Sequence, residues 1–249
     1  MKEKKIKKWE PENFELEMTT HWSFPKRGDW ATHDAKWRGN WSPYIPRNIL
    51  LRYSNENDLV LDQFAGGGTT LIEAKLLKRD IIGVDINDTA LERCKSKIDF
   101  NYQFDDGRVY LHKGDARNLN FIEDKSIDLI CTHPPYADII KYSDDIEDDL
   151  SRLKTKDFLR EMVFVAKESY RVLKDDKYCA ILMGDTRKKG HLVPLSFKVM
   201  QIFEESGFKL KELIVKEQHN CTATGYWKTN SIKYNFLLIA HEHLFIFKK

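Results

Sequence analysis

The 249-residue sequence has little cysteine, no long hydrophobic run and almost no net charge. Its four cysteines (Cys94, Cys131, Cys179 and Cys221) are far apart and form no CxxC pair. This argues against a disulfide framework or a structural zinc and favours a reducing cytoplasm. No apolar run approaches the roughly 18–20 residues of a membrane span, and the charged N-terminus lacks the apolar core of a secretory signal. The net charge of +2 gives no global sign of a nucleic-acid partner.

Charge is concentrated locally instead. Five lysines fall within the first eight residues, and Arg187, Lys188 and Lys189 form a second basic cluster. Each group is as compatible with solvated surface as with contacts to phosphate. The acidic segment 144–149 is interpreted as a solvated loop or helix start rather than a site.

Segments that predict strands alternate with segments that predict helices from residue 46 onward. The predicted strands are 58–62, 80–86, 108–112, 126–132, 177–184, 208–217 and 232–247, and the predicted helices are 69–78, 88–102, 156–173 and 194–206. This alternation predicts a Rossmann-like α/β fold, with a mostly parallel seven-stranded sheet and helices on both faces. No helix is predicted between the last two strands, so we expect a C-terminal antiparallel hairpin.

The chain divides into an arm and one domain. Residues 1–45 are rich in Trp, Pro, Lys and His without clear periodicity, and we expect them to wrap the core. Residues 46–249 are expected to form a single catalytic domain. Two insertions, about 137–155 and 218–231, are expected to be loops that serve recognition.

A glycine-rich loop, DQFAGGGTT, joins the strand 58–62 to the helix 69–78. Its glycines permit a left-handed backbone and close approach of a ligand, and the helix start offers unpaired N–H groups. The next strand ends at Asp85, placed to accept both hydroxyls of a ribose. The third leads to Asp115, whose carboxylate can accept from an adenine amino group. Three strand ends therefore predict a cofactor that contains adenosine.

The spacing of the glycines discriminates among such cofactors. NAD sites use G-x-G-x-x-G and P-loops need G-K-S/T, and this loop has neither. S-adenosylmethionine fits better, because it has no pyrophosphate to place on the helix end. The predicted cofactor-binding residues are Asp62, Phe64, Ala65, Gly66, Gly68, Thr69, Thr70, Asp85, Ile86, Asp115 and Ala116.

The stretch THPPY at 132–136 ends the apolar strand 126–132 with two prolines, which cannot continue a central strand. DQFAGGGTT and THPPY together resemble the DNA amino-methyltransferases, which carry an F-x-G-x-G cofactor motif and a [D/N/S]-P-P-[Y/F] catalytic motif. WSPYIPRNIL and the final HEHLFIFKK are similar too, so the resemblance covers about residues 20–249. It implies methyl transfer from S-adenosylmethionine to an exocyclic amine of double-stranded DNA, and leaves open whether a cognate restriction endonuclease exists.

The resemblance implies four catalytic residues: His133, Pro134, Pro135 and Tyr136. The side chain at 133 and the Pro134 carbonyl would accept hydrogen bonds from the amine. The two prolines would fix the direction of these acceptors. Tyr136 would stack on a flipped base, which is worth roughly 1–3 kcal/mol. His133 departs from the usual Asp, Asn or Ser. A neutral imidazole can still accept one hydrogen bond, whereas a protonated one cannot.

Several alternatives stay open. Cytosine N4 is slightly favoured over adenine N6, because His133 is not the acidic residue that adenine enzymes commonly carry. An RNA or tRNA guanine-N2 methyltransferase would share both motifs, and a non-catalytic nucleic-acid-binding subunit would share the fold. A cytosine-C5 mechanism is rejected, since the chain has no Pro-Cys dipeptide and Cys131 is interpreted as a core residue.

Residues outside the two motifs supply the remaining candidates. Basic and aromatic side chains beyond strand ends suit contacts to nucleic acid, and the predicted set is Arg187, Lys188, Tyr226, Trp227 and Lys228. Trp22, Phe24, Pro25, Trp41 and Pro43 either cover the methionine end of the cofactor or pack the arm. No metal site is predicted, because His241 and His243 have no third ligand nearby.

Overall fold

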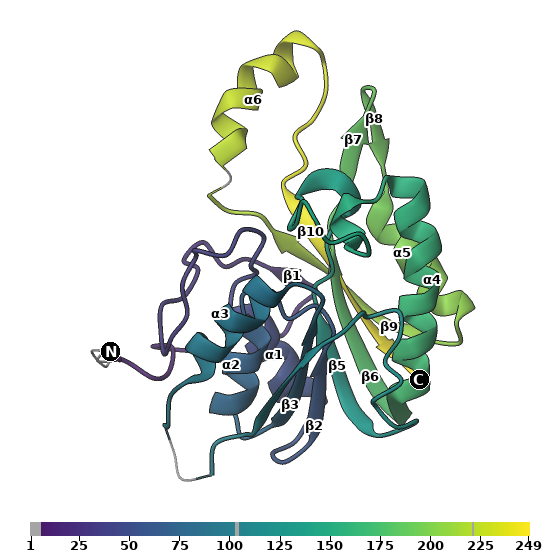
Figure 1. The fold of residues 1–249 in the computed structure, drawn as a ribbon. Helices are drawn as coiled ribbons and strands as arrows, with labels where there is room; N and C mark the ends of the chain where they lie inside the picture. The colour runs from purple at the N-terminus through teal and green to yellow at the C-terminus, as the bar shows by residue number, and fades with distance from the viewer. Residues whose placement is uncertain (1–5, 103–104, 221) are drawn as a thin grey trace.

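The central sheet of the computed structural model has eight strands in the order β1-β9-β10-β6-β5-β2-β3-β4 (Figure 1). The structure describes residues 6–102, 105–220 and 222–249. Neighbouring strands of this sheet are parallel except at β10, which is antiparallel to both β6 and β9. The strands are β1 (His21–Trp22), β2 (Leu59–Asp62), β3 (Asp80–Asp85), β4 (Val109–Lys113), β5 (Ile127–Thr132), β6 (Leu173–Met183), β9 (Lys209–Glu217) and β10 (His241–Lys248), with a separate hairpin of β7 (Thr186–Lys188) and β8 (His191–Val193).

Helices cover both faces of the sheet, as Figure 1 shows. One face carries α1 (Tyr44–Tyr53), α2 (Thr69–Leu76) and α3 (Asp88–Ile98), and the other carries α4 (Thr155–Val172) and α5 (Leu195–Glu205). The helix α6 (Thr222–Lys233) lies in the connection from β9 to β10 and projects away from the sheet. Two 3-10 turns, η1 (Ala137–Ile139) and η2 (Leu150–Arg152), follow β5.

Every residue of β5 is buried, which is the expected state of an apolar strand in the middle of a parallel sheet. Its side chains alternate between two hydrophobic cores, because successive residues of a strand point to opposite faces. Ile130 packs with residues of α4 and α5, whereas Leu129 and Cys131 pack with residues of α1 and α2. Burial raises the pKa of the Cys131 thiol. The interpretation of Cys131 as a core residue is therefore confirmed.

The predicted fold class is confirmed, and the last two strands pair as expected, but three details of the prediction are wrong. The sheet has an eighth strand because β1, in the arm, pairs with β9. The last strand begins at His241 rather than at 232, since His241 pairs with Glu217 at the end of β9 and earlier residues have no neighbouring strand. The segment 218–231, predicted as a loop, contains most of α6.

The arm is fixed to α1 and α2 by a buried carboxylate. Glu73 of α2 is fully buried, and its Oε1 lies 2.7 Å from both Trp30 Nε1 and His33 Nε2. Arg47 of α1 donates from Nη1 to Glu73 Oε2 at 2.9 Å. We call these four residues the Glu73 cluster. It holds the arm against the helices that carry the glycine loop.

No helix within the described ranges is long and apolar enough to cross a membrane. Of the cysteines that the structure describes, Cys94, Cys131 and Cys179 are buried and unpaired. Cys221 and the first five residues, with three lysines of the basic tail, lie outside the described residues.

Candidate active site

The ends of β2, β3 and β5 meet at one edge of the sheet, because parallel strands all present their carboxyl ends there. Asp62 ends β2, Asp85 ends β3 and Thr132 ends β5. Thr132 Oγ1 donates to Asp62 Oδ1 at 2.8 Å, and the Phe64 amide donates to the same oxygen at 3.1 Å. Burial raises the pKa of Asp62 to about 6. Asp62 thus ties the glycine loop to the strand that leads into the double proline.

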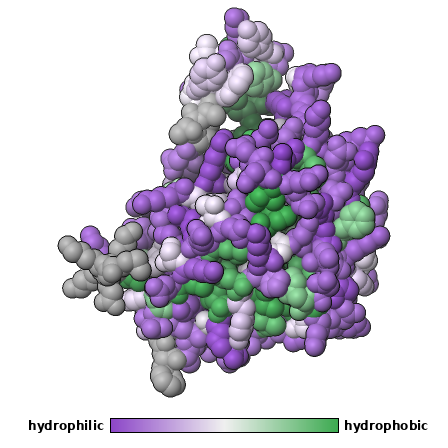
Figure 2. Space-filling model, in the orientation of Figure 1, coloured by the Kyte–Doolittle hydropathy of each residue, from purple (hydrophilic) through white to green (hydrophobic). Residues whose placement is uncertain are grey.

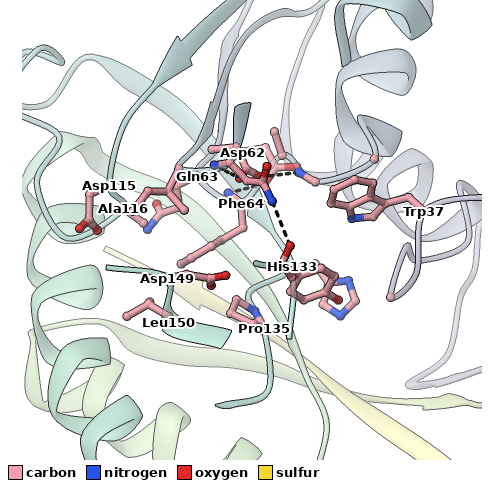
Figure 3. A pocket seen from close by; sticks show the side chains of 18 of the residues that line it. Trp37, Asp62, Gln63, Phe64, Asp115, Ala116, His133, Pro135, Asp149 and Leu150 are labelled. Carbon is pink, nitrogen blue, oxygen red and sulfur yellow. Dashed lines mark hydrogen bonds between the residues drawn. The ribbon is translucent and has the colours of Figure 1, made fainter. Parts of the chain in front are cut away.

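A first pocket opens at this edge (Figure 3). In Figure 3, Asp62 and Phe64 lie on one side, Asp149 and Pro135 on the opposite side, and Trp37 at one end. Its lining comprises Trp37, Gly39, Asn40, Trp41, Asp62, Gln63, Phe64, Ala65, Gly66, Gly67, Asp85, Ile86, Asn87, Gly114, Asp115, Ala116, His133, Pro135, Tyr142, Asp148, Asp149 and Leu150.

Eight of the eleven predicted cofactor-binding residues line this pocket: Asp62, Phe64, Ala65, Gly66, Asp85, Ile86, Asp115 and Ala116. Gly68, Thr69 and Thr70 do not line it. Gly68 precedes α2 with a φ of 81°, and an added Cβ there would lie 3.2 Å from Cys94 Sγ. Thr69 donates from Oγ1 to Asn40 Oδ1 at 2.8 Å. These positions shape the helix start and hold the arm, so they are more distant from the pocket than the motif suggested.

Asp85, which was predicted to accept ribose hydroxyls, also fixes the glycine loop. Its Oδ2 accepts from the Gly66 amide at 2.8 Å, and its Oδ1 accepts from the Asn87 amide at 2.9 Å. Burial raises the pKa of this carboxyl. Each oxygen keeps a second lone pair, so the carboxylate can still accept hydroxyl groups from the pocket.

The arm, rather than a ligand, requires glycine at 67. A Cβ at Gly67 would lie 2.7 Å from Asn40 Nδ2 and 2.8 Å from Trp37 Cβ. Trp37 in turn stacks on Tyr142, with ring centroids 6.1 Å apart and planes within 6°. No periodic pattern in the arm predicted these contacts. The richness of the arm in aromatics was the one available indication.

Asp115 is held by a neighbouring guanidinium. Arg117 Nε lies 2.9 Å from Asp115 Oδ2, and Arg117 Nη2 lies 3.0 Å from Asp148 Oδ1. Asp149 is buried and accepts from Ser143 Oγ at 2.6 Å. The acidic segment was interpreted as a solvated loop rather than a site. Asp148 is exposed as expected, but Asp149 is buried, and both residues line the pocket.

A second pocket lies beyond the double proline. His133 and Pro135 belong to both pockets, as do Trp41 and Tyr142. The second pocket is lined by Phe24, Pro25, Arg27, Ala35, Gly39, Asn40, Trp41, Ser42, His133, Pro134, Pro135, Tyr136, Ile139, Ile140, Tyr142, Gly184, Asp185, Lys216, Glu217, Gln218, His219, Asn220, Ile239 and Glu242. The rigid turn after β5 is therefore a wall with one pocket on each side.

The arm side chains that were expected to cover the cofactor or to pack the arm lie in different places. Trp22 is buried in the core, whereas Phe24 and Pro25 line the second pocket. Trp41 stacks on His133, with ring centroids 5.2 Å apart and planes 23° apart.

A chain of polar side chains runs from the wall into the sheet. His133 Nε2 lies 2.6 Å from the Tyr136 hydroxyl, which donates to Glu242 Oε1 at 2.9 Å. Lys216 donates from Nζ to Glu242 Oε2 at 2.8 Å. Burial lowers the pKa of His133 to about 4. Burial opposes ionisation of Glu242, yet Lys216 and His133 hold its pKa below the usual value. Glu242 and Lys216 were not predicted from the sequence.

The Tyr136 ring lies against the end of β6. A Cβ at Gly184 would lie 2.6 Å from Tyr136 Cε2, so glycine is needed there for the ring to keep its place. Burial raises the pKa of Tyr136 well above that of a free tyrosine, so its hydroxyl keeps its proton.

The predicted nucleic-acid residues lie on two projections from the same end of the sheet, α6 and the β7–β8 hairpin (Figure 1). The face shown in Figure 2 is mostly hydrophilic there. Tyr226 and Trp227 of α6 are 73% and 44% exposed, and Lys228 is exposed beside them. Arg187 donates to the Leu237 carbonyl at 2.8 Å, and Lys188 pairs with Asp138 at 2.9 Å. These two basic residues therefore already have partners within the chain.

Comparison with known proteins assigns the class. The chain matches the model of the DNA methylase family of N6 and N4 methyltransferases over residues 1–96 and 127–249, and a general methyltransferase domain over 60–148. The chain therefore belongs to the N6/N4 DNA methylase family.

Curated relatives match over short stretches. The chain is 43% identical over 54 residues to the type II methyltransferase M.HpaI of Haemophilus parainfluenzae, covering 22% of this chain and 17% of that one. It is 54% identical over 46 residues to the type II methyltransferase M1.MboII of Moraxella bovis, covering 17% and 18%. It is 34% identical over 100 residues to a tRNA (guanine(10)-N2)-dimethyltransferase of Methanothermobacter thermautotrophicus, covering 40% and 28%. The matches span less than a third of each relative.

Solved structures share the fold. An S-adenosylmethionine-dependent methyltransferase of Methanosarcina mazei has a TM-score of 0.57 at 16% identity, covering 81% of this chain and 96% of that one. Another from Archaeoglobus fulgidus has a TM-score of 0.52 at 19% identity, covering 84% and 95%.

The residues of the first pocket fit S-adenosylmethionine by the chemistry of their polar groups. Asp85 and Asp115 supply carboxylates at adjacent strand ends, and the Gly66–Gly67 backbone runs between Asp85 and the arm. Carboxylates can accept the hydroxyl and amino hydrogens of an adenosine, and the apolar side chains of Phe64 and Ile86 can contact its base.

Proposed function

We propose that the protein transfers a methyl group to an exocyclic amino group of a flipped base in double-stranded DNA, with cytosine N4 favoured over adenine N6. The observation that carries this proposal is the shared wall. His133 and Pro135 line both the cofactor pocket and the second pocket, so a group bound in one pocket lies next to a group bound in the other.

When bound, S-adenosylmethionine supplies a methyl group on a sulfonium. The chain's own residues would then hold and orient the amine. The His133 imidazole and the Pro134 carbonyl would accept hydrogen bonds from the N–H groups of the amine. The lone pair of the amine nitrogen would then be free to attack the methyl group. Pro134 and Pro135 would keep those acceptors fixed, since in-line displacement depends on geometry. Tyr136 would bound the base after it leaves the duplex.

The electrostatics of His133 support its role as an acceptor. Burial lowers the pKa of its imidazole to about 4, so the ring is neutral at physiological pH. Cytosine N4 remains the favoured target over adenine N6, because this chain has a neutral imidazole at the position where adenine enzymes commonly carry an acidic residue.

Recognition of DNA would fall to the projections around the second pocket. Tyr226, Trp227 and Lys228 on α6 combine aromatic faces with a positive charge, a combination that suits contact with nucleic acid. Arg187 and Lys188 would contribute by holding the base of α6 and the segment after β5, and could reach phosphate only by leaving their present partners. A cognate restriction endonuclease, if one exists, would recognise the same sequence.

A tRNA guanine-N2 methyltransferase is the second candidate, favoured by the 100-residue match to such an enzyme. One assay separates the candidates. The purified chain is incubated with methyl-labelled S-adenosylmethionine and either unmethylated duplex DNA or unmodified tRNA, and the digested nucleosides are identified by mass spectrometry. We expect N4-methylcytosine from DNA. N6-methyladenine would correct the base, and N2-methylguanosine from tRNA alone would replace the proposal. Binding of the cofactor without transfer to either polymer would indicate a non-catalytic subunit.

A further inference from the structure

Glu242 reaches the active site from an unexpected direction. It is the second residue of β10, and β10 is antiparallel to its neighbours, so the start of this strand lies at the edge where the parallel strands end. Glu242 is 8% exposed and accepts from Tyr136, 106 residues earlier in the chain. A carboxylate in this setting needs donors for its oxygens, and Lys216 and Tyr136 supply them.

The direction of each hydrogen bond in this chain is fixed by chemistry. An ionised carboxylate only accepts and an ammonium only donates, so the Tyr136 hydroxyl must give its single hydrogen to Glu242 Oε1. The same hydroxyl can then only accept from the His133 nitrogen 2.6 Å away. That nitrogen, Nε2, must therefore carry a hydrogen.

A neutral imidazole has one hydrogen on its two nitrogens. If Nε2 carries it, Nδ1 keeps a free lone pair. No described residue gives Nδ1 a hydrogen-bond partner, and the His133 ring lines both pockets. We propose that Glu242, acting through the Tyr136 hydroxyl, is a positioning residue that sets the tautomer of His133 and so makes Nδ1 the acceptor for the substrate amine. The role toward the amine rests on the proposed function, whereas the tautomer does not.

The charges that face His133 come from three directions. Glu242 on β10 favours the protonated ring, and Lys216 on β9 and Arg27 in the arm oppose it. Glu242→Gln keeps the shape of the side chain but offers an amide that can donate as well as accept. The hydroxyl of Tyr136 is then free to reverse its hydrogen bond, and His133 can take either tautomer. Tyr136→Phe removes the hydroxyl and the constraint by a different route.

The tautomer can be measured directly. The full chain is labelled with 15N-histidine, and long-range 1H–15N spectra are recorded without DNA at neutral pH. The His133 signals are assigned by their loss in His133→Asn. We expect a wild-type His133 with an unprotonated Nδ1 and a protonated Nε2, and a mixture of tautomers or a reversal in both Glu242→Gln and Tyr136→Phe. The matched control is Glu212→Gln on β9, which we expect to leave the His133 signals unchanged.

The outcomes are distinct. A proton on Nδ1 in the wild type, or a wild-type tautomer retained in both variants, would overturn the proposal. If one variant fails to fold, as judged by its thermal transition, the other decides. In the methyl-transfer assay we expect Glu242→Gln to lower kcat on the order of tenfold, the loss of about one hydrogen bond, with cofactor affinity retained. If the variants show the expected tautomer shift but the wild type transfers no methyl group to DNA, the proposed function would be contradicted and the tautomer proposal would stand.

Discussion

Two buried glutamates of this protein look alike and do different things. Glu73 receives hydrogen bonds from three side chains, Trp30, His33 and Arg47. Glu242 receives two, and the chain of bonds continues through Tyr136 to His133. The Glu73 cluster lies between the arm and two helices, where Arg47 also pairs with Glu10 of the arm. The chain from Glu242 ends at a nitrogen without a partner among the described residues.

The difference teaches where to look for chemistry. A buried carboxylate that is surrounded by donors from packed elements stabilises their arrangement, because removing it leaves buried donors unpaired. A buried carboxylate whose partners lead to the wall of a pocket controls which atoms there can donate or accept. Burial and charge alone do not distinguish the two cases, and the end of the hydrogen-bond chain does.

The largest effect is expected at Glu73. Glu73→Ala leaves the indole of Trp30 and Nη1 of the nearly buried Arg47 without their acceptor, so the free energy of unfolding should fall by about 3–5 kcal/mol. Chemical denaturation measures this loss. Glu204→Ala, on the exposed face of α5, is the control and should change stability by no more than about 0.5 kcal/mol. An equal loss in both variants would show that the Glu73 cluster does not stabilise the fold as described.

The next largest effect is expected at Tyr136. Tyr136→Ala removes both the ring beside the second pocket and the link from Glu242 to His133, so methyl transfer should fall roughly 100-fold or more. The affinity for S-adenosylmethionine, measured by calorimetry, should stay nearly unchanged, because Tyr136 does not line the first pocket. Turnover close to the wild-type value would remove Tyr136 from the proposed mechanism.

A smaller effect is expected at Asp85. Asp85→Ala removes a carboxylate from the first pocket and should weaken binding of S-adenosylmethionine by about 1.5–3 kcal/mol. Asp88→Ala is the matched control, since Asp88 lies on the exposed side of α3 in a pair with Lys113. Calorimetry compares the two, and equal affinities would show that Asp85 does not contact the cofactor.

The smallest effect on methyl transfer is expected when the pH is lowered mildly. A free histidine titrates near pH 6.5, but burial lowers the pKa of His133 to about 4, so activity should not lose its acceptor until the pH approaches 4. The unfolded chain takes up the proton first. The stability that the neutral ring contributes is therefore present above pH 6.5 and is lost as the pH falls from 6.5 towards 4.

A pH–rate profile of the wild type against His133→Asn tests this. The amide oxygen of Asn accepts a hydrogen bond but does not titrate, so the limb below about pH 5 should be present only in the wild type. A limb centred near pH 6.5 that is present in the wild type and absent from His133→Asn would show that His133 is solvated rather than buried.

Local patterns predicted the strand ends of the site well. Asp62 and Asp85 could be predicted because an apolar strand, a polar end and a helix follow one another within a few residues, and Asp115 because it closely follows the next strand. His133 and Tyr136 could be predicted from a motif, since two prolines mark the end of β5 in any reading.

Contacts between distant segments could not be predicted in the same way. Trp37 and Asn40 belong to an arm without periodicity, so the sequence did not indicate which of its side chains would reach the glycine loop. The alternation in the last strand predicted that it is a strand. It did not predict which side chains face which side of the sheet, because that depends on the register with β6 and β9. Glu242 therefore stood in a predicted strand with no sign that it would meet Tyr136.

The position of β10 determines the order in which the two pockets can form while the chain is being synthesised. The first pocket is lined entirely by residues up to Leu150, whereas the second needs residues of β9 and β10. β10 comes after every other described strand in the sequence yet pairs between β6 and β9. A growing chain can thus assemble its cofactor pocket before β10 has been translated, while Tyr136 still lacks Glu242. Joining these distant segments carries the loop-closure cost of non-local pairing, so the insertion of β10 should be a late folding step that completes the second pocket.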